Sequence, residues 1–172
     1  SSATRVADDG FHFKTGPDPD IGNNRSVKFN LDGTKMFLID VWVNSTGRRI
    51  IEFNLSTPYD TSTVTEGNSF TISGTTTILQ DFSFDDDGTR MYVIETATSP
   101  GVRYIYVYKL STGFDITTAT FAGKVQQVFE SLGGSTNGTP LGMGFSEDGM
   151  KLYQVTYQDG SIGARDRVHE YD

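Results

Sequence analysis

Three consecutive carboxylates precede a glycine at Asp85-Asp86-Asp87-Gly88, which is the residue composition of a calcium-binding loop. An EF-hand loop completes its oxygen ligands with a glutamate six residues after the glycine. Position 94 is isoleucine, and Glu95 lies one residue too far along the chain. We therefore interpret the segment as a hairpin turn with additional acidic residues. The sequence predicts no cofactor, and calcium is the alternative.

A second oxygen-rich group, Asp18, Asp20 and Asn24, lies in the turn-rich segment 14–26. These side chains could bind a hard cation. A solvated Asp-Pro turn explains the same residues without a ligand. We prefer the turn and predict no metal ligands.

The two histidines, His12 and His169, each lie in a predicted strand. Either could serve as a metal ligand or a general base, but a half-exposed strand residue is the simpler interpretation. The chain has no Ser-His-Asp order, no nucleophile elbow and no zinc-ligand spacing. The sequence therefore predicts a protein that is not an enzyme.

Other residues could bind or carry sugars. Four aromatic side chains could form a platform for a sugar ring, or could instead pack between sheets: Trp42, Tyr59, Tyr104 and Tyr106. Three Asn-x-Ser/Thr triplets are candidate glycosylation sites in a secreted protein: Asn44, Asn54 and Asn137. Asn44 falls at a predicted outer turn and is the most accessible candidate.

A threefold repeat must position these residues. The segments 29–37, 84–92 and 145–153 share one pattern: Phe, two residues, Asp-Gly, one residue, a cation, Met or Leu, and an aromatic residue. Asp-Gly between β-rich runs is a strong hairpin signal, because glycine accepts the positive φ of a tight turn. The glycines are 55 and 61 residues apart, which is a suitable period for a four-stranded propeller blade.

The middle repeat shows the expected elements. We predict strands over 81–84, 90–96, 102–110 and 123–129, rich in aromatic and β-branched residues. The connector between the third and fourth strands recurs as Tyr59-Asp60 and Phe114-Asp115, each followed by hydroxyl residues. This pattern predicts an Asx- or ST-turn in which the aromatic side chain packs as a plug.

The hairpin Phe-x-x-Asp-Gly-Thr-Lys-Met-Phe resembles the Phe-Ser-Pro-Asp-Gly-Thr-Lys-Leu-Tyr hairpin of WD40-like, YVTN-type and lactonase-like β-propellers. The Leu-Ser-Thr-Pro-Tyr-Asp connector is similar to one in extracellular bacterial and phage-associated propeller repeats. The resemblance covers nearly the whole chain, although the Gly-His and Trp-Asp pairs of WD40 repeats are absent. It specifies the fold far better than the function, because propellers host many unrelated activities.

The resemblance implies an all-β fold of four-stranded antiparallel blades, about three per chain, with both faces of each blade buried by neighbours. The expected divisions of this single repeat domain are an orphan fourth strand over 1–13, blade one over 26–72, blade two over 81–129 and the first three strands of blade three over 142–172. Loops between blades line one end of a propeller's central channel and are its usual binding site. The residues implied there are Asp18, Asp20, Asn24, Trp42 and Tyr104.

Composition narrows the classes of partner. The formal charge of −8 argues against nucleic acid, which would be repelled. No run of 18 apolar residues is present, so we expect no membrane span. The absence of cysteine excludes a disulfide framework and thiolate chemistry.

Three blades are too few to close a ring, since propellers have at least about four. We expect the segment Thr4–Phe13 of one chain to complete the last blade of a neighbour by pairing with Arg167–Tyr171. Two chains would then form a six-bladed ring, or head-to-tail donation would build a filament. The third alternative is that the sequence is an excerpt of a longer chain.

The sequence thus favours a non-catalytic structural, adhesion or recognition subunit of an extracellular, cell-surface or virion assembly, with a carbohydrate or protein ligand. The resemblance also allows a lactonase-like hydrolase with a channel metal, for which Asn30, Asp40, Glu52 and Asp81 could be recruited. A third hypothesis is an intracellular scaffold for other proteins.

Overall fold

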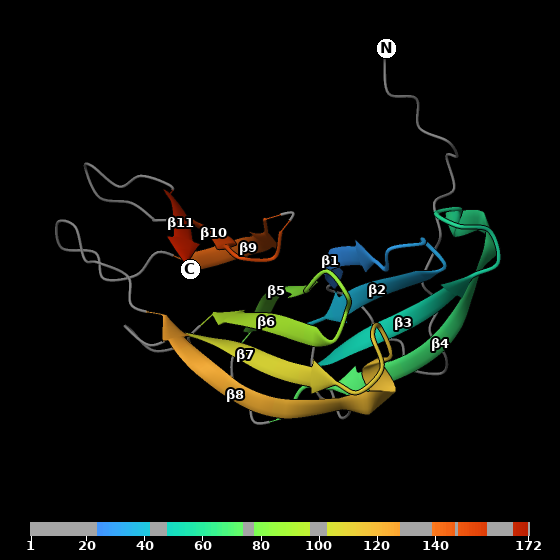
Figure 1. Cartoon of the computed structure of the whole chain (residues 1–172), viewed down its shortest axis with the longest axis horizontal. Helices are drawn as coiled ribbons and strands as arrows, with labels where there is room; N and C mark the ends of the chain where they lie inside the picture. The colour runs from blue at the N-terminus through green and yellow to red at the C-terminus, as the bar shows by residue number, and fades with distance from the viewer. Residues whose placement is uncertain are drawn as a thin grey trace, which may run out of the picture.

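The computed structural model describes residues 24–41, 48–73, 78–96, 103–127, 139–146, 148–157 and 167–171. In this part of the chain, eleven strands form three antiparallel sheets, and a short 3-10 helix precedes the last strand of each of the first two (Figure 1). The predicted all-β fold with sheets of three to four strands is therefore confirmed. The three described sheets do not close into a ring (Figure 1).

Each sheet is built from strands that follow one another in the chain. The first sheet has the order β1 (Asn24–Phe29), β2 (Lys35–Asp40), β3 (Arg49–Leu55) and β4 (Val64–Thr71), with η1 (Thr61–Thr63) before β4. The second sheet has the order β5 (Ile78–Phe84), β6 (Arg90–Thr96), β7 (Arg103–Leu110) and β8 (Ala119–Gln127), with η2 (Ile116–Thr118) before β8. The third sheet contains β9 (Thr139–Phe145), β10 (Leu152–Tyr157) and β11 (Arg167–Tyr171), with β10 in the middle.

Within the described residues, two strands of the second sheet begin earlier than predicted. β5 begins at Ile78 instead of residue 81, and β8 begins at Ala119 instead of residue 123. The cause in β8 is a bulge, because Tyr108 pairs with Phe121 whereas Val107 pairs with Gly123, which leaves one residue over. Gly123 has a φ of +150° and lies inside the strand, so a glycine that looked like a strand start marks a bulge.

The sheets stack in one repeated direction. We call one side of each sheet the leading face, with Met36, Leu38 and Phe53 in the first sheet and Met91, Val93 and Tyr108 in the second. The opposite side is the trailing face, with Phe37, Ile39 and Ile50 in the first sheet and Tyr92, Ile94 and Ile105 in the second.

The first sheet's trailing face forms one buried cluster with the second sheet's leading face. The second sheet's trailing face packs in the same way on Met143 and Leu152 of the third sheet.

Among the first strands of the sheets, β5 contacts both β1 and β9, whereas β4 and β8 lie on the outer rim (Figure 1). Polar bonds join these inner strands. Lys28 of β1 lies 3.6 Å from the Asp81 carboxylate of β5, and the other Asp81 oxygen accepts the Met143 N–H of β9 at 2.7 Å. Arg25 of β1 also bonds Gln80 of β5. One buried carboxylate therefore links all three sheets.

The two ends of the stack differ in exposure. The first sheet's leading face is buried and forms its own cluster. On the third sheet's trailing face, the paired residues Val155 and Val168 are 43% and 67% exposed. This face departs from the expectation that neighbours cover both sides of every sheet. Within the described residues, no helix has the length and apolar character needed to cross a membrane.

Candidate binding site between the second and third sheets

The hairpin turns have the geometry that the Asp-Gly pattern predicts. Gly33, Gly88 and Gly149 have φ values of +71°, +70° and +67°. The carboxylate before each glycine accepts the backbone N–H of the residue after it, at 2.9 to 3.1 Å. In the first two turns the threonine hydroxyl donates to the same oxygen, which holds the pKa of Asp32 and Asp87 below the ordinary value.

A connector lies against each of the first two turns. Asp60 and Asp115 cap η1 and η2 by accepting the backbone N–H two residues later, which confirms the predicted Asx-turns. The preceding aromatic residues, Tyr59 and Phe114, have φ values of +60° and +56°. Their rings lie directly against the hairpin glycines, where a Cβ would come within 2.4 and 2.3 Å of ring carbons. We call residues 55–63 and 110–118 the first and second aromatic connectors.

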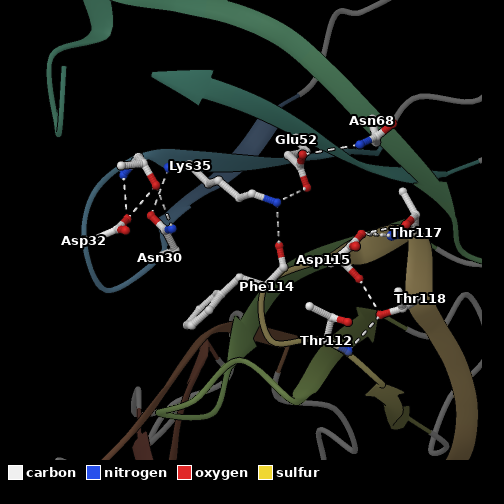
Figure 2. A network of polar contacts seen from close by, with 11 residues as sticks. Asn30, Asp32, Lys35, Glu52, Asn68, Thr112, Phe114, Asp115, Thr117 and Thr118 are labelled. Carbon is white, nitrogen blue, oxygen red and sulfur yellow. Dashed lines mark hydrogen bonds and ion pairs between the residues drawn. The ribbon is translucent and has the colours of Figure 1, made fainter. Parts of the chain in front are cut away.

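The second aromatic connector also joins two sheets, as Figure 2 shows. The Lys35 Nζ on β2 donates to Glu52 Oε2 at 3.2 Å and to the Phe114 carbonyl at 3.1 Å (Figure 2). Ile116 of the same connector is fully buried in the cluster between the first and second sheets. The connector therefore fills the space between two stacked sheets.

The corresponding space between the second and third sheets is a cavity of about 320 Å³, within the size range of ligand pockets. Its walls are mostly apolar and come from both sheets: Tyr92, Ile105, Val107, Val125, Gln126, Gln127, Phe145, Gly149, Met150, Leu152 and Tyr171. Gln127 is 2% exposed and donates to Gln154 Oε1 at 2.6 Å, but its own Oε1 has no hydrogen-bond partner among the described residues. An unpaired buried acceptor beside an apolar cavity marks a place that can receive a donor.

The structure describes only some of the binding residues and glycosylation sites that the sequence predicts. Asp18, Asp20, Trp42, Asn44 and Asn137 lie outside the described residues, as do His12 and the segment 4–13. Asn24 begins β1 at the inner strands, and its buried Oδ1 has no hydrogen-bond partner within the described ranges. Asn54 is exposed on β3.

The aromatic platform proposed from sequence is divided between two places. Tyr59 packs on Gly33 in the first connector. Tyr104 and Tyr106 neighbour each other on β7, with ring centroids 6.3 Å apart, and Lys124 Nζ lies 3.9 Å above the Tyr104 ring. The Tyr106 hydroxyl donates to Glu95 at 3.0 Å, and burial followed by this contact raises its pKa. Of these three described aromatic residues, Tyr59 belongs to a connector and Tyr106 is held in the core.

The acidic residues considered for a channel metal are each engaged separately. Asp40 lies 3.4 Å from Arg49, Glu52 is paired with Lys35, and Asp81 serves the inner strands. Asn30 bonds Thr34 and the Lys35 N–H within its hairpin. In the described part of the chain, no three His, Asp or Glu side chains come together as a ligand group.

The Asp85–Asp87 segment has the hairpin role we preferred. Asp85 accepts the Arg90 N–H at 2.9 Å, and Asp87 bonds Thr89. His169 is a part-buried strand residue 3.0 Å from Thr156 Oγ1, and its burial lowers its pKa, so the ring is neutral near pH 7. Asp85, Asp87 and His169 are thus each hydrogen-bonded within their own hairpin or sheet.

No protein-family model matches the chain, and no curated protein matches it either. The cavity must therefore be interpreted from its own geometry.

Sequence reasoning missed the residues that shape this cavity. Gln127 and Gln154 stand in ordinary strands, and nothing in the local pattern distinguishes them. The positive φ of Tyr59 and Phe114 was also missed, although both aromatic residues were expected to act as plugs. The two aromatic-Asp connectors were identified from the sequence, and their pairing with two of the three hairpins was the signal that could have indicated this cavity.

Proposed function

We propose that this protein is a non-catalytic structural, adhesion or recognition subunit of an extracellular or virion assembly built from β-propeller repeats. The observation that carries the proposal is the repeated stacking of sheets, trailing face on leading face, with the first strands innermost. Blades are arranged in this way around a propeller axis. Stacking of unlike faces is also how heterologous assemblies form, as closed rings or as open filaments.

The third sheet supplies the surface through which association would occur. Its trailing face presents the exposed Val155 and Val168 beside the half-buried Tyr153, at positions that a neighbouring sheet covers in the first sheet. Among the described strands β11 pairs only with β10, so its other edge is open to a further strand. We propose that the segment 4–13 of a neighbouring chain pairs there. The acidic charge and the exposed Asn54 are compatible with an extracellular setting.

The native mass of the purified chain tests the proposal. We expect light scattering to give at least twice the 18.9 kDa of one chain, while intact mass spectrometry gives 18.9 kDa. A double substitution, Val155→Lys with Val168→Lys, should reduce the native mass because it places two charges in the interface. Leu31→Lys is the matched control, since Leu31 is 73% exposed at a hairpin turn of the first sheet. A wild-type chain that stays monomeric, or an intact mass well above 18.9 kDa, would overturn association between separate chains.

A further inference from the structure

We infer that the cavity between the second and third sheets is the acceptor site for a third aromatic connector, a segment of the sequence type Leu-Ser-Thr-x-aromatic-Asp that lies outside the described residues. The inference goes beyond the proposed assembly because it names a binding site and the chemistry of its occupant. It requires neither an extracellular setting nor donation of the segment 4–13.

The three hairpin glycines share one backbone conformation but differ in what lies against them. Gly33 and Gly88 are each covered by the ring of an aromatic connector. Gly149 has the same φ and lines the cavity, but the nearest atoms to a Cβ built there belong to the Asp86 carboxylate, at 3.5 Å and beyond. Of the three equivalent turns in the described chain, one therefore lacks its ring.

The cavity lies against the second sheet as the second aromatic connector lies against the first sheet. The second aromatic connector lies between the first and second sheets, where its wall includes Phe37, Ile50, Phe70 and Ile72. The pairing register of β6, β7 and β8 places Tyr92, Ile105, Val125 and Gln127 at the same positions one sheet further on. All four line the cavity, and Val125 is 59% exposed. The wall that a connector would cover is already in place.

Two backbone hydrogen bonds hold each described connector against its hairpin. In the first connector, Leu55 N–H donates to the Thr34 carbonyl at 2.8 Å and Tyr59 N–H donates to the Gly33 carbonyl at 2.9 Å. The second connector repeats both bonds, at 2.8 and 3.0 Å, on Thr89 and Gly88. The equivalent carbonyls in the third hairpin belong to Met150 and Gly149, and no described residue donates to them.

The unpaired Gln127 Oε1 adds a side-chain acceptor to these two carbonyls. A connector carries Ser and Thr hydroxyls and backbone N–H groups, which are the donors that such a site requires. The two described connectors already cover Gly33 and Gly88, so neither is free to fill the third position. A third segment of the same chemistry, distinct from these two connectors, is therefore the occupant that we assign.

A synthetic peptide provides the test. We expect the peptide Leu-Ser-Thr-Gly-Phe-Asp-Ile-Thr-Thr-Ala, a copy of residues 110–119, to bind the full chain saturably in a nuclear magnetic resonance titration. The amide signals that shift should include Gly149, Met150 and the Gln127 side chain. The same peptide with Phe replaced by Ala should bind about tenfold more weakly, because a buried aromatic anchor carries most of such an interaction.

Two protein variants keep the result interpretable. Val125→Trp should fill the cavity and abolish peptide binding, and Val125→Glu should weaken binding by placing a charge on its wall, while circular dichroism stays unchanged in at least one of them. The inference is overturned if the peptide fails to bind, if the Ala peptide binds equally well, or if the shifts map elsewhere. Binding of a free sugar to the same cavity with no peptide binding would also overturn it. Native mass decides the proposed assembly separately, because a monomeric chain can still bind the peptide.

Discussion

At the scale of single residues, the hairpin glycines combine two requirements, a positive φ and room for a ring. Gly88 has a φ of +70°, and an added Cβ would lie 2.3 Å from the Phe114 ring. We expect Gly88→Ala to lower the free energy of unfolding by about 2 kcal/mol or more, measured by urea denaturation, because a left-handed conformation alone costs an L-residue about 1–2 kcal/mol. Gly144→Ala is the control: nothing lies within 4 Å of its Cβ, and its φ is not in the left-handed range. Equal effects at the two positions would contradict this account.

Asp85 differs from its equivalents in the other hairpins, which are Asn30 and Ser146. Partial burial raises the pKa of Asp85, and repulsion from Asp87 adds to the effect. A carboxyl whose pKa is raised by folding destabilises the protein once ionised, and this cost disappears as the pH falls and the group is protonated. We expect Asp85→Asn to increase the free energy of unfolding at pH 7, since Asn30 shows that an amide accepts the same backbone N–H. The gain should shrink below pH 4, and a variant less stable at pH 7 would refute the prediction.

Asp115 predicts the opposite dependence on pH. The Thr117 hydroxyl, followed by the Thr117 N–H, lowers its pKa below the ordinary 3.8. Its stabilising effect is therefore present above about pH 4 and is lost as the pH falls through the lower, folded-state pKa. Asp115→Asn should remove this part of the acid dependence, so thermal melts of the variant should change less than wild type between about pH 4 and 2. Parallel curves for the two proteins would exclude this role for Asp115.

Residue types alone predicted the turns but not the positive φ of the aromatic residues in the connectors. Asp-Gly specifies its turn locally, and Asp60 and Asp115 precede the hydroxyl residues that complete an Asx-turn. An aromatic residue at positive φ has no local reason to be there. Tyr59 and Phe114 adopt it because ring contact with a distant glycine compensates the strain, and a pattern within nine residues does not contain that information.

At the scale of elements, Asp81 holds β9 against β5. Its buried carboxylate accepts the Met143 N–H, so replacing it leaves a donor without its partner. We expect Asp81→Leu to lower the free energy of unfolding by about 1.5–3 kcal/mol, the range for hydrogen bonds to charged groups. Hydrogen exchange should increase most in β9 and β10. Glu66→Leu, on the exposed β4, is the control, and uniform exchange changes over all sheets would contradict a specific link.

Element order followed directly from alternating strand and turn signals, and β6 was predicted with its observed bounds. The start of β8 was missed because Gly123 reads as a boundary while the bulge places it inside a strand. The Asp81–Met143 bond joins residues 62 positions apart, and no local pattern predicts such a partner. Pairing between neighbours in sequence was predictable, whereas contacts between sheets were not.

At the scale of the whole molecule, the uneven cover of the sheets predicts uneven stability. The second sheet is packed on both faces, whereas the third exposes its trailing face and borders the cavity. We expect amides of β10 to exchange with solvent faster than those of β6 in a dilute sample, since local opening is easier where few apolar contacts resist it. Comparable rates in the two strands would show that the third sheet is stabilised by contacts we have not identified. The peptide copy of residues 110–119 should slow exchange in β10 selectively.

The all-β class and the repeated sheets could be predicted from composition and from the spacing of the Asp-Gly hairpins, because the same pattern occurs in every repeat. The number of sheets in a complete assembly depends on surfaces that meet only after folding. The trailing face of the third sheet, with Val155 and Val168 exposed, has the same residue types as a covered face. Sequence alone therefore does not distinguish an end of the stack from its middle.

The aromatic connectors have a consequence for the order in which the chain acquires its structure during synthesis. The Tyr59 hydroxyl bonds the Leu31 carbonyl across 28 residues, so the first sheet can secure its own hairpin before the second sheet has been translated. Short loops close faster and with less loss of entropy than long ones. Each of the first two sheets can thus form its hairpin and connector contacts as soon as its own residues have been synthesised, and the second can then dock onto the first.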